Sequence, residues 1–187
     1  MKVSTITGSI MKRIYPILLA CVTLALTSCS NIQLSDYAKN QPTLIPQEFF
    51  NGNITARGVV KNRSGKVTRY FTATIKASWQ NNIGTLDEKF VFNNGEVQYR
   101  TWKLSPSQPT KFTATAGDIV GTGLGQFAGN AINLNYVLTV KYNNSMINLS
   151  VDDWMWRVDE TTVLNESTLT KFGFKVGSVQ LVMEKDR

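Results

Sequence analysis

The chain contains no histidine, and its two cysteines, Cys21 and Cys29, both lie in an apolar N-terminal stretch. Without histidine, Ser-His and Cys-His nucleophile pairs and His-ligated metal sites are excluded. A folded part without cysteine has neither a disulfide nor a catalytic thiol. We therefore expect no metal and no cofactor, and a protein that is not an enzyme unless its carboxylates perform acid-base chemistry.

Positive charge exceeds negative charge, but it forms no cluster. The 187 residues include 20 basic and 13 acidic ones, a formal net charge of +7. Loss of residues 1–28 would remove Lys2, Lys12 and Arg13 and leave 17 basic residues against 13 acidic ones, a net charge of +4. Scattered charge of this size is typical of a solvated surface, so we expect no nucleic-acid partner.

The N-terminus has the features of a bacterial lipoprotein signal. Lys12 and Arg13 precede an apolar run over residues 14–26, which is too short to span a bilayer as a helix. The sequence Leu26-Thr-Ser-Cys29 follows and resembles the lipobox, in which the cysteine is acylated and the chain is cleaved before it. We expect lipidation at Cys29 by several acyl chains, which anchor a protein stably. Cys21 is a weaker second candidate.

This interpretation divides the chain into three parts. They are a signal peptide over 1–28 (with 1–10 an extension if translation starts at Met11), the acylated Cys29 with a polar tether over 29–48, and a folded domain over 49–187. In lipoproteins of this kind an Asp after the anchor cysteine marks retention at the inner membrane. Ser30 stands there instead, so we expect the periplasmic leaflet of the outer membrane.

Alternating apolar and polar residues mark several half-buried strands. Odd-numbered residues from 67 to 79 form one apolar-rich face, and even-numbered residues from 132 to 142 form another. Turns rich in asparagine and glycine or serine at 62–65, 93–95 and 143–145 separate such runs. About eight to ten strands joined by tight turns predict an all-β fold, an antiparallel meander forming a lipocalin-like barrel or half-barrel, with a β-sandwich as the alternative.

Several charged residues share the apolar faces of these strands. Buried charge needs a partner or water, because an unpaired charge costs several kcal/mol. The group is therefore a structural ion-pair cluster, a head-group site in a mostly apolar cavity, or a set of catalytic carboxylates. Nearby tryptophans would pack the core or line such a cavity. The candidate ligand-binding residues are Arg69, Glu88, Arg100, Trp102, Asp118, Asp153 and Trp154.

The turn at 93–95 sets which residues face each other. If it is a three-residue loop with Gly95 in the left-handed region, Glu88 lies opposite Arg100 on the inner face. A two-residue turn would pair Glu88 with Thr101 and send Arg100 outward, because a one-residue slip reverses the faces of a strand. We favour the first register, and it predicts a Glu88–Arg100 salt bridge.

The segment 121–128 contains Gly123-x-Gly125-x-x-Ala128, which matches a loose dinucleotide-binding fingerprint. Such a site needs a strand, a turn and a helix in a parallel unit, whereas this segment leads into another alternating strand. We expect instead a glycine-rich bend or lid over the mouth of the barrel.

Several motifs resemble a domain-of-unknown-function family of Gram-negative bacterial lipoproteins. They are Leu86-x-Glu88-x-Phe90, Arg100-x-Trp102, Ala116-Gly117-Asp118-x-x-Gly121, Gly129-Asn130-Ala131, Asp152-Asp153-Trp154-Met155 and Lys171-Phe172-Gly173-Phe174-x-x-Gly177. The resemblance covers most of residues 49–185 and implies a fold that is lipocalin-like in outline. The Gly-x-Trp typical of lipocalins is absent, since Gly52 is followed by Asn53 and Ile54. Genes of the family often lie near genes for lipid-modifying enzymes, which implies a role with lipids.

The leading hypothesis is a monomeric binding or carrier module for an apolar or lipid-like ligand, held at the membrane by its N-terminal lipid anchor. It predicts an apolar cavity inside the barrel that reaches solvent. One alternative is a structural or accessory lipoprotein that docks onto another envelope protein through an exposed aromatic patch. The other is a lipid-modifying enzyme that uses Asp118, Asp153 or Glu88.

Overall fold

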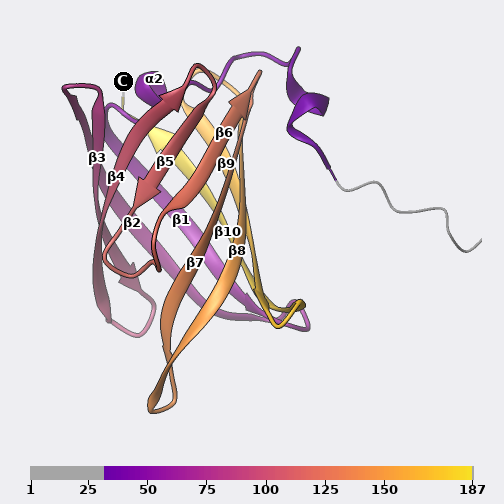
Figure 1. Ribbon diagram of the computed structural model, residues 1–187. Helices are drawn as coiled ribbons and strands as arrows, with labels where there is room; N and C mark the ends of the chain where they lie inside the picture. The colour runs from indigo at the N-terminus through magenta and orange to yellow at the C-terminus, as the bar shows by residue number, and fades with distance from the viewer. Residues whose placement is uncertain (1–31, 187) are drawn as a thin grey trace, which may run out of the picture. The chain divides into compact units, whose positions relative to one another are not determined.

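The computed structural model describes residues 32–186, in which ten antiparallel strands close into a barrel (Figure 1). The elements are η1 (Leu34–Tyr37), α2 (Pro46–Phe49), β1 (Gly52–Asn62), β2 (Val67–Gln80), β3 (Ile83–Phe92), β4 (Val97–Gln108), β5 (Lys111–Thr115), β6 (Gly123–Ala128), β7 (Ala131–Tyr142), β8 (Ser145–Arg157), β9 (Thr162–Lys171) and β10 (Phe174–Lys185). Each strand pairs with the next along the chain, and β10 pairs with β1. The predicted antiparallel meander is confirmed as a closed barrel, and a β-sandwich is excluded.

Alternation along each strand separates the core from solvent. In β2 the side chains of Phe71, Ala73, Ile75 and Ala77 are buried inside the barrel, and the residues between them are exposed. Apolar area removed from water stabilises the fold by roughly 25 cal/mol per Å². The same parity continues around the barrel, because the register places Ala73 opposite Ala56 of β1 and Phe90 of β3.

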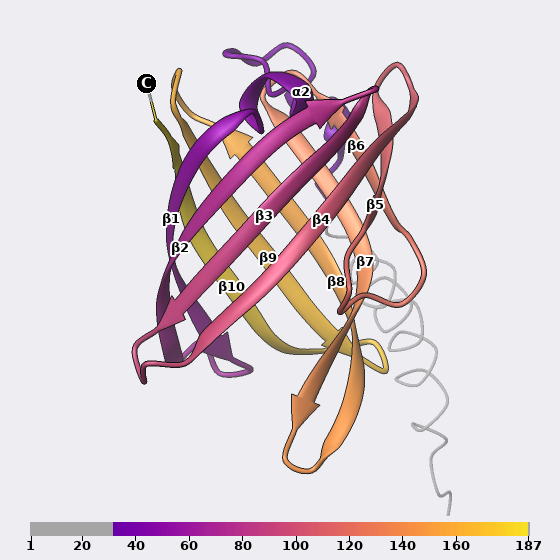
Figure 2. The ribbon, with the colours of Figure 1, turned by 90° about the vertical axis from the view of Figure 1, so that its left-hand side faces the viewer.

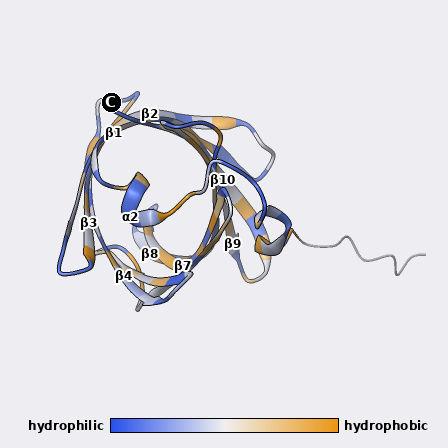
Figure 3. Cartoon of the chain, turned by 90° about the horizontal axis from the view of Figure 1, so that it is seen from above, coloured by the Kyte–Doolittle hydropathy of each residue, from blue (hydrophilic) through white to orange (hydrophobic). Residues whose placement is uncertain are grey.

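The chain before β1 closes one end of the barrel. Leu44, Pro46 and Phe49 are among the most deeply buried side chains, and α2 lies within the outline of the barrel seen from above (Figure 3). Trp79 donates a hydrogen bond from Nε1 to the carbonyl oxygen of Phe50, at 2.7 Å. No helix within residues 32–186 is long and apolar enough to span a bilayer.

The expected polar tether over 29–48 is therefore corrected for its described part, which belongs to the compact unit beginning at Gln33. In this segment the residues around α2 close the end of the barrel, and η1 packs on its outer wall. There Tyr37 contacts Trp154 and Trp156 at ring-centroid distances of 5.9 and 6.1 Å. A Cβ atom at Gly129 would lie 1.8 Å from the carbonyl oxygen of Tyr37. Only glycine permits this close approach of two backbones.

The end of the barrel opposite α2 is less tightly filled. Inward-facing residues there are partly accessible; they include Val60, Phe90, Leu138, Val179 and Leu181. The hairpin of β7 and β8 extends beyond its neighbours at this end (Figure 2). Inward-facing side chains are thus fully buried near α2 and only partly buried at the other end.

The strands β5 and β6 are short, and residues outside the strands extend the wall beside them. Residues 116–121 continue it by pairing with β7, where the backbone amide of Thr139 donates to the carbonyl of Asp118 and that of Val120 to the carbonyl of Val137, both at 2.8 Å. Within residues 32–186, no backbone hydrogen bond joins 116–121 to residues 97–102 of β4. The seam between these two segments is closed by side chains.

The glycine-rich stretch is a strand, and the predicted bend or lid is wrong. Gly123 and Gly125 face inward from β6, and a Cβ atom at Gly125 would lie 2.2 Å from Cζ of Phe112. The two glycines leave room for side chains that lie across the strand, here the ring of Phe112 and Tyr136. The fingerprint thus reflects side-chain packing inside a barrel.

Candidate functional site

The hairpin of β3 and β4 has the predicted register. Gly95 adopts a φ of 82°, the amide of Phe92 donates to the carbonyl of Glu96 at 2.9 Å, and that of Gly95 donates to the carbonyl of Phe92 at 2.9 Å. The three-residue loop is confirmed. It places Glu88 opposite Arg100, with both residues at inward-facing positions.

The predicted salt bridge between these two residues is nevertheless wrong. Arg100 donates from Nε and Nη2 to Oδ2 of Asp118, at 2.9 and 2.7 Å. Oε2 of Glu88 is buried and has no hydrogen-bond partner. Arg100 binds Asp118 instead of Glu88. Asp118 belongs to segment 116–121, which lies beside β4 but has no backbone hydrogen bond to that strand. The Arg100–Asp118 pair joins the two segments by side chains instead.

Asp153 occupies a buried position on β8. Its Oδ1 accepts hydrogen bonds from Nδ2 of Asn165 at 2.6 Å and from Oγ of Ser167 at 2.7 Å, both on β9. Burial raises the pKa of Asp153 to about 6, although the hydrogen bonds from Ser167 and Asn165 oppose the rise. Two neutral donors therefore bind Oδ1, and within residues 32–186 no salt bridge joins Asp153 to a cation.

The charged groups inside the barrel shift one another's pKa values. Burial raises the pKa of Glu88 to about 7; Arg100 opposes the rise, Asp118 and Asp153 add to it, and the side chain of Trp102 opposes it as a hydrogen-bond donor. Burial also raises the pKa of the Tyr136 hydroxyl, with Asp153 contributing next. We define the lumen cluster as Glu88, Arg100, Asp118, Tyr136 and Asp153. It holds three carboxylates and one guanidinium.

Aromatic rings surround the cluster. Trp102 is buried inside the barrel, its ring meets that of Tyr136 edge-on at 5.3 Å, and Cζ of Arg100 lies 5.6 Å from its centroid. Phe90 lies on the other side of the same guanidinium, at 5.8 Å. The polar cluster is thus held in a mostly apolar lumen.

Two of the candidate residues lie elsewhere. Arg69 pairs with Glu96 at 2.7 Å and stacks on Phe92 at 3.6 Å, close to the β3–β4 turn. Trp154 lies on the outer wall, where it stacks on Trp156 and donates from Nε1 to Oδ2 of Asp152 at 3.1 Å. The structure therefore does not bring either residue into the lumen cluster.

The sequence reasoning missed Tyr136, Asn165 and Ser167. Tyr136 shares the inward parity of Ile132 and Leu134, and its hydroxyl was counted as part of an apolar face. The signal for the other two was a pair of polar residues at alternate positions after the buried Val163. Within residues 32–186, no group of three or more His, Cys, Asp or Glu side chains could hold a metal ion.

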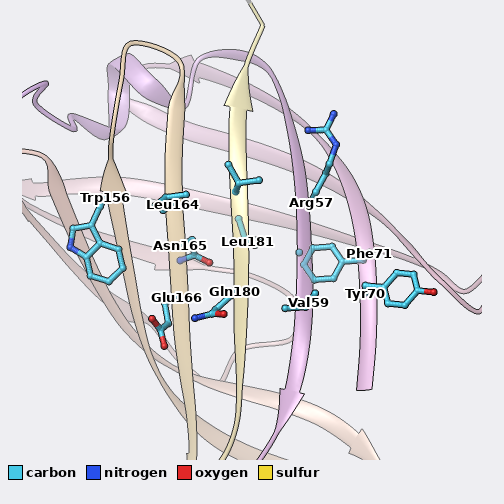
Figure 4. A pocket seen from close by; sticks show the side chains of 12 residues that line it. Arg57, Val59, Tyr70, Phe71, Trp156, Leu164, Asn165, Glu166, Gln180 and Leu181 are labelled. Atoms are coloured by element: carbon cyan, nitrogen blue, oxygen red, sulfur yellow. The ribbon is translucent and has the colours of Figure 1, made fainter. Parts of the chain in front are cut away.

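A separate hollow of about 640 Å³ lies across β8, β9, β10, β1 and β2 (Figure 4). Most of its lining positions face outward by the register; they include Tyr70, Val59, Gln180, Leu164 and Trp156. We call it the outer groove. It is not the interior cavity that the carrier hypothesis predicts, and that cavity stays a prediction.

Comparisons of the structure and of the sequence with known proteins identify a similar fold and the family. The S-type phycobiliprotein lyase CPES from Guillardia theta has a similar structure, with a TM-score of 0.54 and 12% sequence identity over 84% of this chain and 99% of that chain. No protein with a curated description matches the sequence. The family described as "Protein of unknown function (DUF3833)" matches residues 23–185, and the chain belongs to that family.

Proposed function

We propose that this protein is a membrane-attached binding or carrier module that takes an apolar or lipid-like ligand into the accessible half of its barrel. The observation that carries the proposal is the division of the lumen. Near α2 it is filled by buried side chains, and beyond the lumen cluster its apolar wall is partly accessible, as at Phe90, Val179 and Leu181. The fold shared with a phycobiliprotein lyase supports a ligand-binding barrel.

The division of the lumen suits an amphiphile. An apolar chain would cover the exposed inward side chains, which stabilises a complex by roughly 25 cal/mol for each Å² removed from water. A few polar groups at the inner end of a mostly apolar pocket fix the orientation of a ligand. The lumen cluster lies where such an end group would come to rest.

The proposed membrane attachment rests on the sequence. The lipobox ends at Cys29, which lies outside the described residues, and the compact unit begins only four residues later, at Gln33. A triacylated Cys29 would hold the monomeric barrel close to the periplasmic face of the outer membrane. In that position the ligand could be taken from, or delivered to, the lipid surface.

A binding experiment tests the proposal. The barrel is formed entirely by residues after Gln33, so the chain from residue 30 onward can be produced without acyl chains or detergent. We expect a fluorescent long-chain alcohol to bind with a dissociation constant in the range of about 1 µM. Val179→Trp should block binding by filling the lumen, and Thr72→Trp, which adds the same ring to the exposed outer wall, should not. Equal binding by both variants would contradict a lumen site.

The outer groove favours a second candidate, docking onto another envelope protein. Tyr70 and Leu164, both in the groove, are 60% and 46% exposed, and Trp156 lies at its edge. Exposed apolar side chains that gather in one hollow are typical of an interaction surface. Cross-linking in cells should then lose a specific partner in Leu164→Asp, while the lumen variant Val179→Trp keeps it.

A further inference from the structure

We infer that the lumen cluster recognises an amphiphile whose head is a cationic N–H donor, such as a primary ammonium, and discriminates against a carboxylate head. This inference rests on the proposed carrier function and specifies its ligand. The head group would meet Glu88 and Asp118, each of which has a buried acceptor atom without a hydrogen-bond partner.

The balance of charge within the lumen cluster is the first argument, since Arg69, which shares the inward parity of β2, is already paired with Glu96 near the β3–β4 turn. Arg100 is the single cation of the lumen cluster, and both of its hydrogen bonds within the cluster go to one oxygen, Oδ2 of Asp118. Oδ1 of Asp153 accepts hydrogen bonds from the neutral donors Asn165 and Ser167. Glu88 is left without a dedicated cation, so the cluster has more negative than positive groups. A carboxylate ligand would add to the excess, and a cation would reduce it.

The unused acceptors are the second argument. Oε2 of Glu88 and Oδ1 of Asp118 are buried, and neither has a donor. A buried acceptor that lacks a donor is destabilising, and more so if it is charged. A primary ammonium carries three N–H donors and no acceptor, so one head group could supply both oxygens. A carboxylate head supplies no donor.

The neutral side chains that face the cluster also favour a cation. The rings of Phe90, Trp102 and Tyr136 come from β3, β4 and β7, and two of them already contact the guanidinium of Arg100. A cation near the face of an aromatic ring is attracted electrostatically to that face. The Tyr136 hydroxyl stays protonated, since its pKa is raised, and it adds no negative charge.

The test compares three probes with the same twelve-carbon chain, each below its micelle concentration: dodecylammonium, dodecanoate and dodecanol. Binding to the chain from residue 30 onward is measured by calorimetry at about pH 8, above the pKa of about 7 of Glu88. We expect dodecylammonium to bind at least about tenfold more tightly than dodecanoate. Glu88→Gln should remove most of this preference, because it keeps the shape of the side chain and abolishes its charge.

Asp87→Asn is the matched control. Asp87 is the neighbour of Glu88 on β3, but its side chain is exposed on the outer wall, where it accepts a hydrogen bond from Thr101 at 2.6 Å. Its removal should leave the preference unchanged. If Glu88→Gln does not fold, the wild-type chain provides the second measurement: the preference for dodecylammonium over dodecanol should shrink between about pH 8 and about pH 5.5, as Glu88 takes up a proton.

The outcomes separate this inference from the carrier function. Dodecanoate binding as tightly as dodecylammonium, or a preference that survives both Glu88→Gln and the lower pH, would overturn the inference and leave the carrier function standing. If none of the three probes binds, or if Val179→Trp binds them unchanged, the carrier function itself fails.

Discussion

Glu88 and Arg100 lie directly opposite each other across β3 and β4, yet the guanidinium of Arg100 bonds to Asp118 and leaves Oε2 of Glu88 without a partner. The register of β3 against β4 therefore does not determine which carboxylate pairs with Arg100. Arg100 closes the seam between β4 and residues 116–121, and Glu88 remains available inside the lumen. Of these two facing residues, Arg100 thus holds the wall together and Glu88 makes the interior polar.

Arg100→Ala should be the most destabilising charge removal in the barrel. It leaves Asp118 and Glu88 without their shared cation and opens the seam beside β4. Because the two side chains are only partly buried, we expect a loss of about 1–3 kcal/mol in the free energy of unfolding, measured in urea at neutral pH. Arg57→Ala is the control, because Arg57 pairs with Glu184 on the exposed outer wall and should cost under about 1 kcal/mol. Equal losses in the two variants would argue against a structural role for the Arg100–Asp118 pair.

Glu88→Gln should flatten the pH dependence of stability. The pKa of Glu88, about 7 in the folded barrel, lies above its ordinary 4.5, so the folded state holds the proton more tightly than the unfolded chain. The stability that this group contributes is fully present below about pH 4.5 and is lost as the pH rises through about 7. Between about pH 4.5 and about pH 8, the variant should lose less stability than the wild type, by up to about 3 kcal/mol.

The pH series needs one further comparison. Asp153, whose pKa is raised to about 6, acts in the same direction and is present in both proteins, so it cancels in the difference. Asp87→Asn should follow the wild-type profile, because Asp87 is exposed on the outer wall. Parallel profiles for the wild type and Glu88→Gln would mean that Glu88 is ionised in the folded barrel as easily as in water.

Local periodicity made most of the fold predictable. Parity along β2 gives its inner face, and Gly95 fixes the register of β3 against β4, because both depend on neighbouring residues alone. The partner of Arg100 depends on where residues 116–121 run, and that path is set by the unequal lengths of β5 and its neighbours. No local pattern encodes this path. Sequence alone therefore assigned Glu88, Arg100, Asp118 and Asp153 to one group correctly, included Arg69 wrongly, and predicted the wrong partner for Arg100.

Non-periodic segments were harder to interpret. Leu44 is fully buried, but it lies in a stretch with prolines and polar residues that has the composition of a linker. Trp154 follows the inward-facing Asp153 on β8, so the sequence predicts that its side chain points outward. The sequence does not predict that Tyr37 packs over it. In each case the decisive contact joins residues far apart in the chain.

Gly125→Ala should destabilise the barrel by overpacking. A Cβ atom there would lie 2.2 Å from Cζ of Phe112, and the ring can yield only by shifting within the packed end of the lumen. We expect a loss of about 1–3 kcal/mol in urea unfolding. Gly117→Ala is the control, since no atom lies within 4 Å of a Cβ built at Gly117. The double variant Gly125→Ala with Phe112→Leu should recover part of the loss, and a loss that the smaller side chain leaves untouched would point to the backbone of β6 instead.

Cys29→Ser should abolish acylation of the chain. Cys29 ends the lipobox Leu26-Thr-Ser-Cys29, and Cys21 is the other cysteine of the sequence, separated from Arg13 by only seven residues. Palmitate labelling in a Gram-negative host should mark the wild type and Cys21→Ser equally and should be absent from Cys29→Ser. Because several acyl chains are needed for stable anchoring, the Cys29→Ser variant should also be absent from the outer-membrane fraction. Labelling that persists in Cys29→Ser and vanishes in Cys21→Ser would move the anchor upstream, and the segment between anchor and barrel would then grow by eight residues.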